Sequence, residues 1–172
     1  MKTRALAEVV AGGLALGVAT ATHAEAQTAV SKPAKEVVVT NREARGTFEV
    51  KLTPQPVHTA TGGATLGRMT IDKQFHGDLD AVSTGEMLSA MTAVQGSAGY
   101  VAMELVRGTL HGRKGTFVLQ HSAFMTRGTP GLTVTVVPDS GTDELVGLAG
   151  KMEIIIEEGR HSYKFDYSLP GD

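Results

Sequence analysis

The residues with the clearest capacity for chemistry are a glutamate and a histidine on two β-prone runs that meet at a glycine-containing turn. The runs cover about Tyr100 to Leu110 and Thr116 to Phe124. A turn centred on Gly112-Arg113 predicts a β-hairpin in which Glu104 lies directly across from His121. Facing side chains have Cβ atoms about 4.5–5.5 Å apart, so the carboxylate and the imidazole are expected to bond.

A carboxylate and an imidazole that share an apolar cavity have coupled proton affinities. The face of the hairpin that carries Glu104 and His121 also carries Tyr100, Val106 and Leu119, so we expect it to point inward. Two interpretations remain open. The pair could transfer protons or orient a ligand, or it could be a structural ion pair in which each group is the other's hydrogen-bond partner. Glu104, His121 and Tyr100 are therefore candidate ligand-binding residues.

A third run, from about Val82 to Ala93, contains Glu86. Its period favours a strand, although its Ala, Met and Leu content also suits a short helix. If this run folds back symmetrically around Gln95, Glu86 comes close to Glu104. It would then add a second carboxylate to the cavity, which would raise the pKa of one of the two.

The remaining histidines give weaker signals. His76 ends its run beside a Gly-Asp turn and is expected at the surface, while His58 and His111 fall in loops and look solvated. His161 shares a face with Tyr163 and is expected either at the cavity rim or at an ordinary core position.

Motifs for other chemistries are missing from the sequence. It has no His-x-His, no His-Glu-x-x-His and no cysteine, so we expect no metal site. No Gly-x-Ser-x-Gly, Walker loop or dinucleotide fingerprint follows a strand, so we expect no cofactor. His121 and Ser122 are adjacent on one strand and point to opposite faces, so they cannot form a nucleophile–base dyad.

From Arg45 onward the sequence alternates with a period of two and is broken by turn residues every 10 to 15 positions or so. Around the turn Glu158-Gly159, two runs pair Glu157 with Arg160 and Glu153 with Lys164, which are opposite charges. The total is about eight antiparallel strands. We predict an all-β, closed, eight-stranded up-and-down barrel rather than a sandwich, because closure removes exposed edges. Such a barrel is either filled by side chains or holds one small ligand.

The amino terminus has the pattern of an export signal. A positive start at Met1 to Arg4 precedes an apolar stretch from Val9 to Ala21, and Ala24-Glu25-Ala26 suits cleavage before Gln27. The apolar stretch is too short for a transmembrane anchor. We expect a signal peptide at 1–26, a flexible tether at 27–43 and the barrel domain at 44–170, with Val37 to Val39 as an alternative first strand. The protein is then periplasmic or secreted.

Composition limits the partners. The formal net charge of the 172-residue chain is −2, and no run of Lys and Arg occurs. This balance predicts no nucleic-acid partner, and no membrane partner once the signal is removed. The expected partner is a small apolar ligand, and a homo-oligomer is also open.

Several strings of this sequence resemble a family of small bacterial proteins known only as a domain of unknown function. The resemblance extends from about Ala44 to Tyr167. It implies a closed eight-stranded barrel similar to the allene oxide cyclase-like barrels, and it implies no reaction. The chain differs in its export signal and in having Val134 where an aromatic residue is common. The strings are Gly46-Thr47-Phe48-Glu49-Val50, Phe75-His76-Gly77-Asp78-Leu79, the hairpin from Gly108 to Ser122, and Val137-Pro138-Asp139-Ser140-Gly141-Thr142.

Three functions remain at this point. The first is an exported barrel that binds a small apolar ligand, with Glu104 and His121 as a polar anchor. The second is a cofactor-free isomerase or cyclase that uses the same pair for proton transfer. The third is a structural or oligomerising barrel whose interior is filled.

Overall fold

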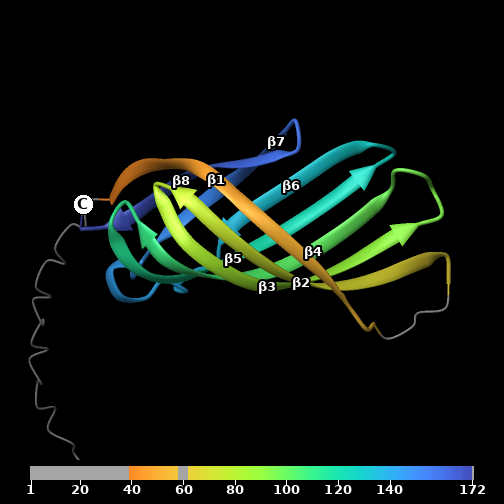
Figure 1. Cartoon of the computed structure of the whole chain (residues 1–172), viewed down its shortest axis with the longest axis horizontal. Helices are drawn as coiled ribbons and strands as arrows, with labels where there is room; N and C mark the ends of the chain where they lie inside the picture. The colour runs from red at the N-terminus through yellow and green to blue at the C-terminus, as the bar shows by residue number, and fades with distance from the viewer. Residues whose placement is uncertain (1–38, 58–61, 172) are drawn as a thin grey trace, which may run out of the picture. The chain divides into compact units, whose positions relative to one another are not determined.

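A computed structural model describes residues 39–57 and 62–171. Each strand pairs antiparallel with the next, and β8 returns to β1, so the sheet closes into a barrel (Figure 1). This confirms the predicted all-β, eight-stranded up-and-down barrel. The elements are β1 (Val39–Gln55), β2 (Ala64–Gly77), β3 (Leu79–Thr92), β4 (Ala98–Leu110), β5 (Arg113–Thr126), β6 (Thr129–Val136), a 3-10 turn η1 (Asp143–Leu145), β7 (Ala149–Glu157) and β8 (Arg160–Pro170).

The β7–β8 hairpin has the predicted register, with Glu157 opposite Arg160 and Glu153 opposite Lys164. The run that contains Glu86 is strand β3 and not a helix. The barrel begins earlier than predicted: β1 starts at Val39, where it pairs with Pro170 of β8, rather than at residue 44. Residues 39–43, which were expected to belong to the tether, are therefore part of β1. The expected signal peptide lies outside the described residues.

The two ends of the barrel differ in packing. We call the end that carries the β2–β3 and β4–β5 turns and η1 the closed end. Its interior is filled by buried Phe, Leu and Tyr side chains. Leu145 and Leu148, in and just after η1, are buried there as well. Large apolar side chains point inward from the surrounding strands and pack against one another at this end.

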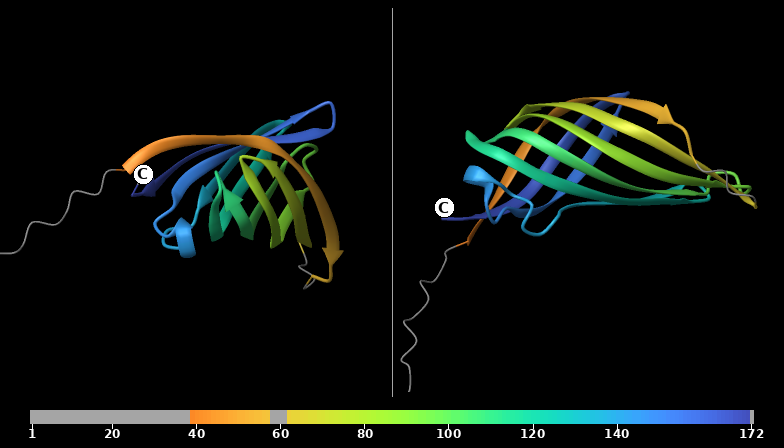
Figure 2. Two further views of the ribbon diagram at one scale, coloured as in Figure 1. Left: turned by 60° about the vertical axis from the view of Figure 1, so that its left-hand side comes forward. Right: turned by 90° about the horizontal axis from the view of Figure 1, so that it is seen from below.

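The opposite end, which we call the open end, carries the β1–β2, β3–β4, β5–β6 and β7–β8 turns. Apolar side chains on the lumen face are exposed there, among them Leu52, Met91, Met125, Leu132 and Ile156. The β7–β8 hairpin stops well short of the β3–β4 and β5–β6 hairpins (Figure 1). Figure 2 shows β2 to β6 as one continuous curved sheet that extends past it.

The backbone pairing of the barrel is also sparse between β6 and β7. Thr135 and Lys151 form the one registered residue pair between these strands, and they lie toward the closed end. From this pair toward the open end, β6 and β7 have no registered partners in each other. The barrel is therefore least closed at the open end and along the boundary between β6 and β7, which we call the β6–β7 seam. None of the residues in the described ranges forms a helix long and apolar enough to cross a bilayer.

Candidate functional site

The hairpin of β4 and β5 brings Glu104 and His121 together, but through a different register from the predicted one. The turn residues are His111 and Gly112, with φ of 46° and 80°, and Leu110 pairs with Arg113. Two positive φ values are what a tight two-residue hairpin turn requires. Glu104 therefore pairs with Leu119, and the prediction that it lies directly across from His121 is wrong.

The carboxylate and the imidazole are nevertheless in contact. A shift of two residues leaves every side chain on its original face, so Glu104 and His121 become diagonal neighbours inside the barrel. His121 Nε2 lies 2.8 Å from Glu104 Oε2. Both side chains are buried, and Glu104 has no exposed surface at all. The predicted contact of the pair and its inward orientation are therefore confirmed.

Two further side chains complete what we call the Glu104 network (Lys73, Ser83, Glu104 and His121). Lys73 Nζ donates to Glu104 Oε2 across 2.7 Å. The Ser83 hydroxyl donates to the other carboxylate oxygen, Oε1. Neither residue was identified from the sequence. A signal was present for Lys73, because it falls on the same face of its strand as Ile71 and Phe75, where an unpaired charge would be costly.

A glycine on β3 lets a side chain of β2 contact a side chain of β4 across the strand that separates them. Lys73 lies on β2 and Glu104 on β4, with β3 between them. Gly85 of β3 is the direct neighbour of Glu104, so no side chain stands between the ammonium and the carboxylate. A Cβ at Gly85 would come within 2.4 Å of the Met103 carbonyl oxygen and 2.9 Å of Glu104 Cα. Glycine at this position is therefore part of how the network is built.

The network fixes the charge of Glu104. Burial, the largest single influence, acts to raise its pKa, but the hydrogen bond from His121 and the charge of Lys73 oppose it. Together with the bonds from Lys73 and Ser83 they lower the pKa from its ordinary 4.5 to about 2. Lys73 Nζ also lies 5.0 Å and 5.5 Å from the ring centroids of Phe48 and Phe75, whose faces stabilise a cation. Glu104 is thus a carboxylate at neutral pH and accepts hydrogen bonds only.

The hydrogen bond to Glu104 assigns the proton on His121. A carboxylate has no proton to donate, so Nε2 must carry the hydrogen of this bond. No side chain or backbone group in the described part of the chain bonds to Nδ1. Since the two nitrogens of an imidazole point away from each other, Nδ1 faces away from Glu104.

Tyr100 and Glu86, the other two predicted site residues, have different positions. Tyr100 faces the lumen and is half-buried, and burial, together with the charge of Glu104, raises its pKa. Glu86 pairs with Met103 and lies on the outer surface, where Arg68 bonds both of its carboxylate oxygens at 2.7 to 2.9 Å. The expectation that Glu86 reaches the cavity is therefore wrong. The β3–β4 turn is offset by one residue from the symmetric arrangement, and an odd offset reverses the face.

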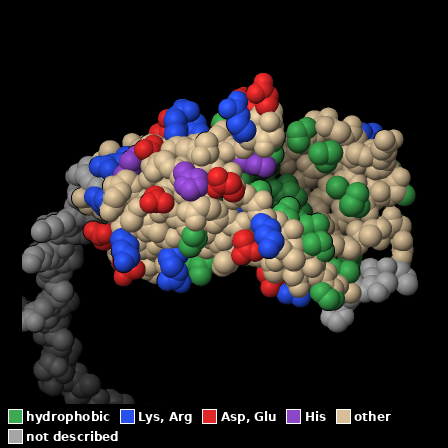
Figure 3. Space-filling view, in the orientation of Figure 1, with side chains coloured by type: hydrophobic (Ala, Val, Ile, Leu, Met, Phe, Trp, Pro, Cys, Tyr) green, Lys and Arg blue, Asp and Glu red, His purple; other side chains and the backbone are tan. Residues whose placement is uncertain are grey.

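An open groove of about 860 Å³ lies over the open-end portions of β2 to β5. Its lumen-facing members are Gly67, Ser89, Tyr100 and Ala123, which form a continuous row across the four strands. Most of its lining comes from outer-face positions of β2 to β5, among them Leu66, Leu88 and Val101, and the rest from Pro56 and Val57, which follow β1. Figure 3 shows hydrophobic side chains gathered around a hollow in the right-hand half of the molecule.

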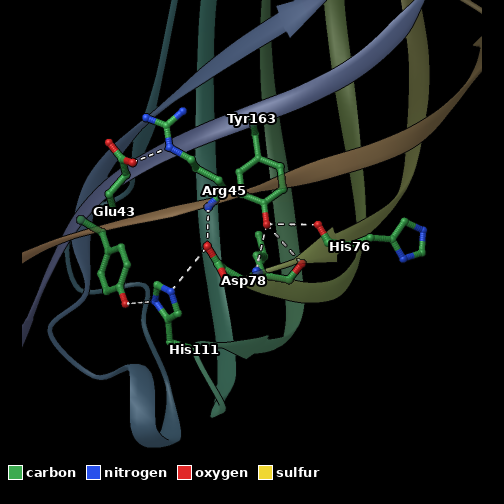
Figure 4. Close-up of polar contacts among 8 residues, drawn as sticks. Glu43, Arg45, His76, Asp78, His111 and Tyr163 are labelled. Atoms are coloured by element: carbon green, nitrogen blue, oxygen red, sulfur yellow. Dashed lines mark hydrogen bonds and ion pairs between the residues drawn. The ribbon is translucent and has the colours of Figure 1, made fainter.

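Polar contacts at the closed end hold the turns in place (Figure 4). The Tyr163 hydroxyl accepts from the Leu79 backbone N–H at 2.9 Å and donates to the His76 carbonyl at 3.3 Å. Asp78 Oδ2 accepts from the Arg45 backbone N–H at 2.8 Å. His111 lies beside it at 3.6 Å. These bonds satisfy backbone groups that the tight β2–β3 turn would otherwise leave without partners.

The other histidines are part of this scaffold or lie on the surface. His111 lies exposed in the β4–β5 turn, as expected, and its Nδ1 lies 2.7 Å from the Tyr167 hydroxyl, to which it hydrogen-bonds. His76 is exposed beside Glu49, as expected. His161 faces the lumen with its ring 5.2 Å from that of Phe48. His58 lies outside the described residues. Among residues 39–57 and 62–171, no three His, Asp or Glu side chains converge as a metal site would require.

Comparisons with known proteins identify a family but no activity. No curated protein matches the chain. A crystal structure of a protein of unknown function from the DUF3224 family of Shewanella oneidensis MR-1 is 54% identical. The match covers 76% of this chain and 98% of that one, with a TM-score of 0.73. The model of a family described as "Protein of unknown function (DUF3224)" matches residues 44–167. The chain therefore belongs to the DUF3224 family.

Proposed function

We propose that this protein binds a small apolar ligand in the open end of the barrel, with the Glu104 network beneath the ligand. The observation that carries the proposal is a change in the lumen lining along the barrel axis. Packed aromatic and aliphatic side chains fill the closed end, the charged network lies above them, and exposed apolar side chains line the open end. Ligand sites commonly combine a mostly apolar lining with a few convergent polar groups.

The rows of lumen-facing residues support this arrangement. The row next to Glu104, toward the open end, runs Met69, Met87, Ala102, His121 and Val134. The following row contains Ser89, Tyr100 and Ala123, which line the groove. A ligand in the lumen at the open end would therefore lie beside Tyr100 in one row and His121 in the next.

Small or flexible side chains surround His121. Val134 lies directly opposite it, and Ala102 is its other direct neighbour. An aromatic side chain in place of Val134 would occupy part of this space. Methionine, as at Met69 and Met87, adapts its flexible thioether side chain to ligands of varied shape.

Within this proposal Glu104 is a positioning residue rather than a ligand contact. It has no exposed surface, and its pKa of about 2 keeps it from taking up or releasing protons near neutral pH. Its role is to hold the imidazole of His121 in one orientation, as a carboxylate does for other functional histidines. His121 and Tyr100 are then the polar groups that a ligand touches.

The test uses N-phenyl-1-naphthylamine, a neutral apolar dye whose fluorescence rises in apolar sites. We expect saturable binding to the full chain. Ala123→Trp, which fills the groove row, should weaken binding at least tenfold. Gln120→Trp is the control, because it adds the same side chain on the same strand at an exposed position outside the groove. Equal affinity for all three proteins, or no saturable binding, would contradict the proposal.

A second candidate is a cofactor-free isomerase or cyclase, and the Glu104–His121 bond is the observation that favours it. A histidine that donates to a carboxylate is a stronger base at its other nitrogen. A base of this kind that removes a C–H proton from a ligand exchanges that proton with solvent. Native mass spectrometry of protein purified from its host would first reveal any bound small molecule. After incubation in D₂O, the small molecule is extracted and returned to H₂O, which removes deuterium from its O–H and N–H groups. A substrate would then keep carbon-bound deuterium, whereas a ligand that is only bound would have its original mass.

We also propose that the protein is exported and that its mature form begins at Gln27. The support is the positive, apolar and small-residue pattern of the first 26 residues. The mass of the protein recovered from the host's periplasm or medium tests this directly, since retention of residues 1–26 would contradict it. The kinship with allene oxide cyclase-like barrels implied by the sequence resemblance is likewise a proposal, supported by the closed up-and-down strand order.

A further inference from the structure

The acceptor nitrogen of His121 has no partner within the barrel. The imidazole is almost completely buried, with 4% of its side-chain surface exposed, and its Nε2–H is taken by Glu104. No group in the described residues donates to Nδ1. A buried acceptor left without a donor destabilises the folded protein, and most such atoms in folded proteins are satisfied by protein, water or ligand.

We infer that the ligand of this site carries a hydroxyl group that donates a hydrogen bond to His121 Nδ1, on an otherwise apolar body. The inference rests on the proposed function and specifies its ligand class: phenols and apolar alcohols. In the neutral form of the imidazole, whose Nε2–H is bound to the Glu104 carboxylate, Nδ1 is an acceptor only. Glu104 also makes Nδ1 a better acceptor, because hydrogen bonds in a chain polarise one another.

The same geometry disfavours ligands whose polar group has no proton to donate to His121 Nδ1. A carboxylate or an ether oxygen would point a lone pair at the lone pair of Nδ1, and neither group brings a proton of its own. The ammonium of Lys73 is already bound to Glu104, at 2.7 Å, and is as deeply buried as the imidazole. Tyr100 remains as the second polar contact, and its hydroxyl is able to accept from or donate to the same ligand group.

The experiment compares three probes of one shape on the wild-type protein: 1-naphthol, 1-methoxynaphthalene and 1-naphthoate. Each is titrated by isothermal calorimetry at neutral pH. We expect 1-naphthol to bind about tenfold more tightly than 1-methoxynaphthalene, the value of one well-formed hydrogen bond. We expect 1-naphthoate to bind most weakly. In His121→Phe, which keeps a ring but has no acceptor, the preference for 1-naphthol should disappear. Tyr100→Phe should keep most of it.

The outcomes separate this inference from the proposed function. If the two neutral probes bind with equal affinity, the barrel binds apolar ligands but the hydroxyl assignment is wrong. Tightest binding of 1-naphthoate would overturn it too, since His121 would then be an imidazolium that donates from Nδ1. If no probe binds and N-phenyl-1-naphthylamine does not either, the proposed function itself fails. The comparison on the wild-type chain does not depend on whether His121→Phe folds.

Discussion

At the scale of single residues, the protein keeps a complete charge pair inside a small barrel. Lys73 and Glu104 are both buried and 2.7 Å apart, and each needs the other. Burying a pair of charges in this way gives little net stability, whereas removing one partner leaves an uncompensated charge. The network is therefore better explained as a device that orients His121 than as a source of stability.

Glu104→Gln should lower the free energy of unfolding by about 3–5 kcal/mol, because it leaves the Lys73 ammonium buried without a counter-charge. Urea unfolding followed by circular dichroism measures the change. The double variant Lys73→Met with Glu104→Gln should recover a large part of the loss, since it removes the stranded charge. A double variant no more stable than Glu104→Gln alone would show that the buried charge is not the cause.

The depressed pKa of Glu104 predicts an acid-sensitive contribution to stability. The folded protein holds this pKa at about 2, below its ordinary 4.5, so on acidification the unfolded chain takes up the proton first. The contribution is complete above about pH 5 and is lost as the pH falls from 4.5 to 2. The shift corresponds to about 3 kcal/mol. Urea unfolding between pH 6 and 2.5 should show this loss in the wild type. Glu104→Gln should lose correspondingly less over the same range; equal losses would rule out Glu104 as the titrating group.

At the scale of strands, the network depends on how closely β3 and β4 approach. Gly85 leaves a gap through which Lys73 reaches Glu104, and its missing side chain would collide with backbone atoms of β4. Two strands that meet this closely depend on glycine at the point of contact. The position of Gly85 is therefore a structural requirement of the site.

Gly85→Ala should destabilise the protein by more than about 2 kcal/mol, because backbone atoms of β4 cannot move aside as a flexible side chain would. It should also separate Lys73 from Glu104 and so weaken the binding of N-phenyl-1-naphthylamine. Gly63→Ala is the matched control: a Cβ there meets nothing within 4 Å, and the backbone is not in the left-handed region. Thermal unfolding of the two variants measures the difference. Equal melting temperatures would contradict the close approach.

The strands also show how much of the fold could be predicted from the sequence alone. Period-two alternation and turn residues predicted eight strands and the barrel, and the charge pairs of β7 and β8 predicted their register. Turn geometry was harder to predict. A positive φ at His111 is unusual for a residue with a side chain, so the β4–β5 turn was placed one position late. That error was harmless because it shifted the register by two residues. In the β3–β4 turn the register was off by one, and Glu86 was put on the wrong face.

The network itself was only half predicted. Glu104 and His121 lie on one hairpin, so a local pattern was enough to pair them. Lys73 and Ser83 come from two other strands, and only the register of β2, β3 and β4 brings them to the same carboxylate. A lysine on the apolar face of its strand was the available sign that a buried partner exists.

At the scale of the whole molecule, the barrel is well closed at one end and loosely closed at the other. The β6–β7 seam has one registered pair, and the β7–β8 hairpin leaves the far part of the β2–β6 sheet uncovered. Sparse pairing lowers the local free energy of opening. Local opening of the barrel is therefore expected to occur first between β6 and β7.

Hydrogen exchange should therefore be uneven around the barrel. Amides of β6 and β7 that point toward the seam should exchange at least tenfold faster than amides between β4 and β5, where every residue from Ala98 to Leu110 has a registered partner. Exchange monitored by NMR under native conditions resolves the two groups. Uniform protection around the barrel would contradict a weak seam.

The most direct test of the central claim, that a ligand occupies the lumen above the Glu104 network, uses the methionine methyl groups as reporters. Met69 and Met87 face the lumen in the same row as His121, whereas Met103 points outward from the same barrel. Methyl NMR spectra are recorded as N-phenyl-1-naphthylamine is added. We predict shifts at Met69 and Met87 that saturate with the binding curve, and an unchanged Met103. Shifts at Met103 with Met69 and Met87 unchanged would place the ligand on the outer surface and contradict the account.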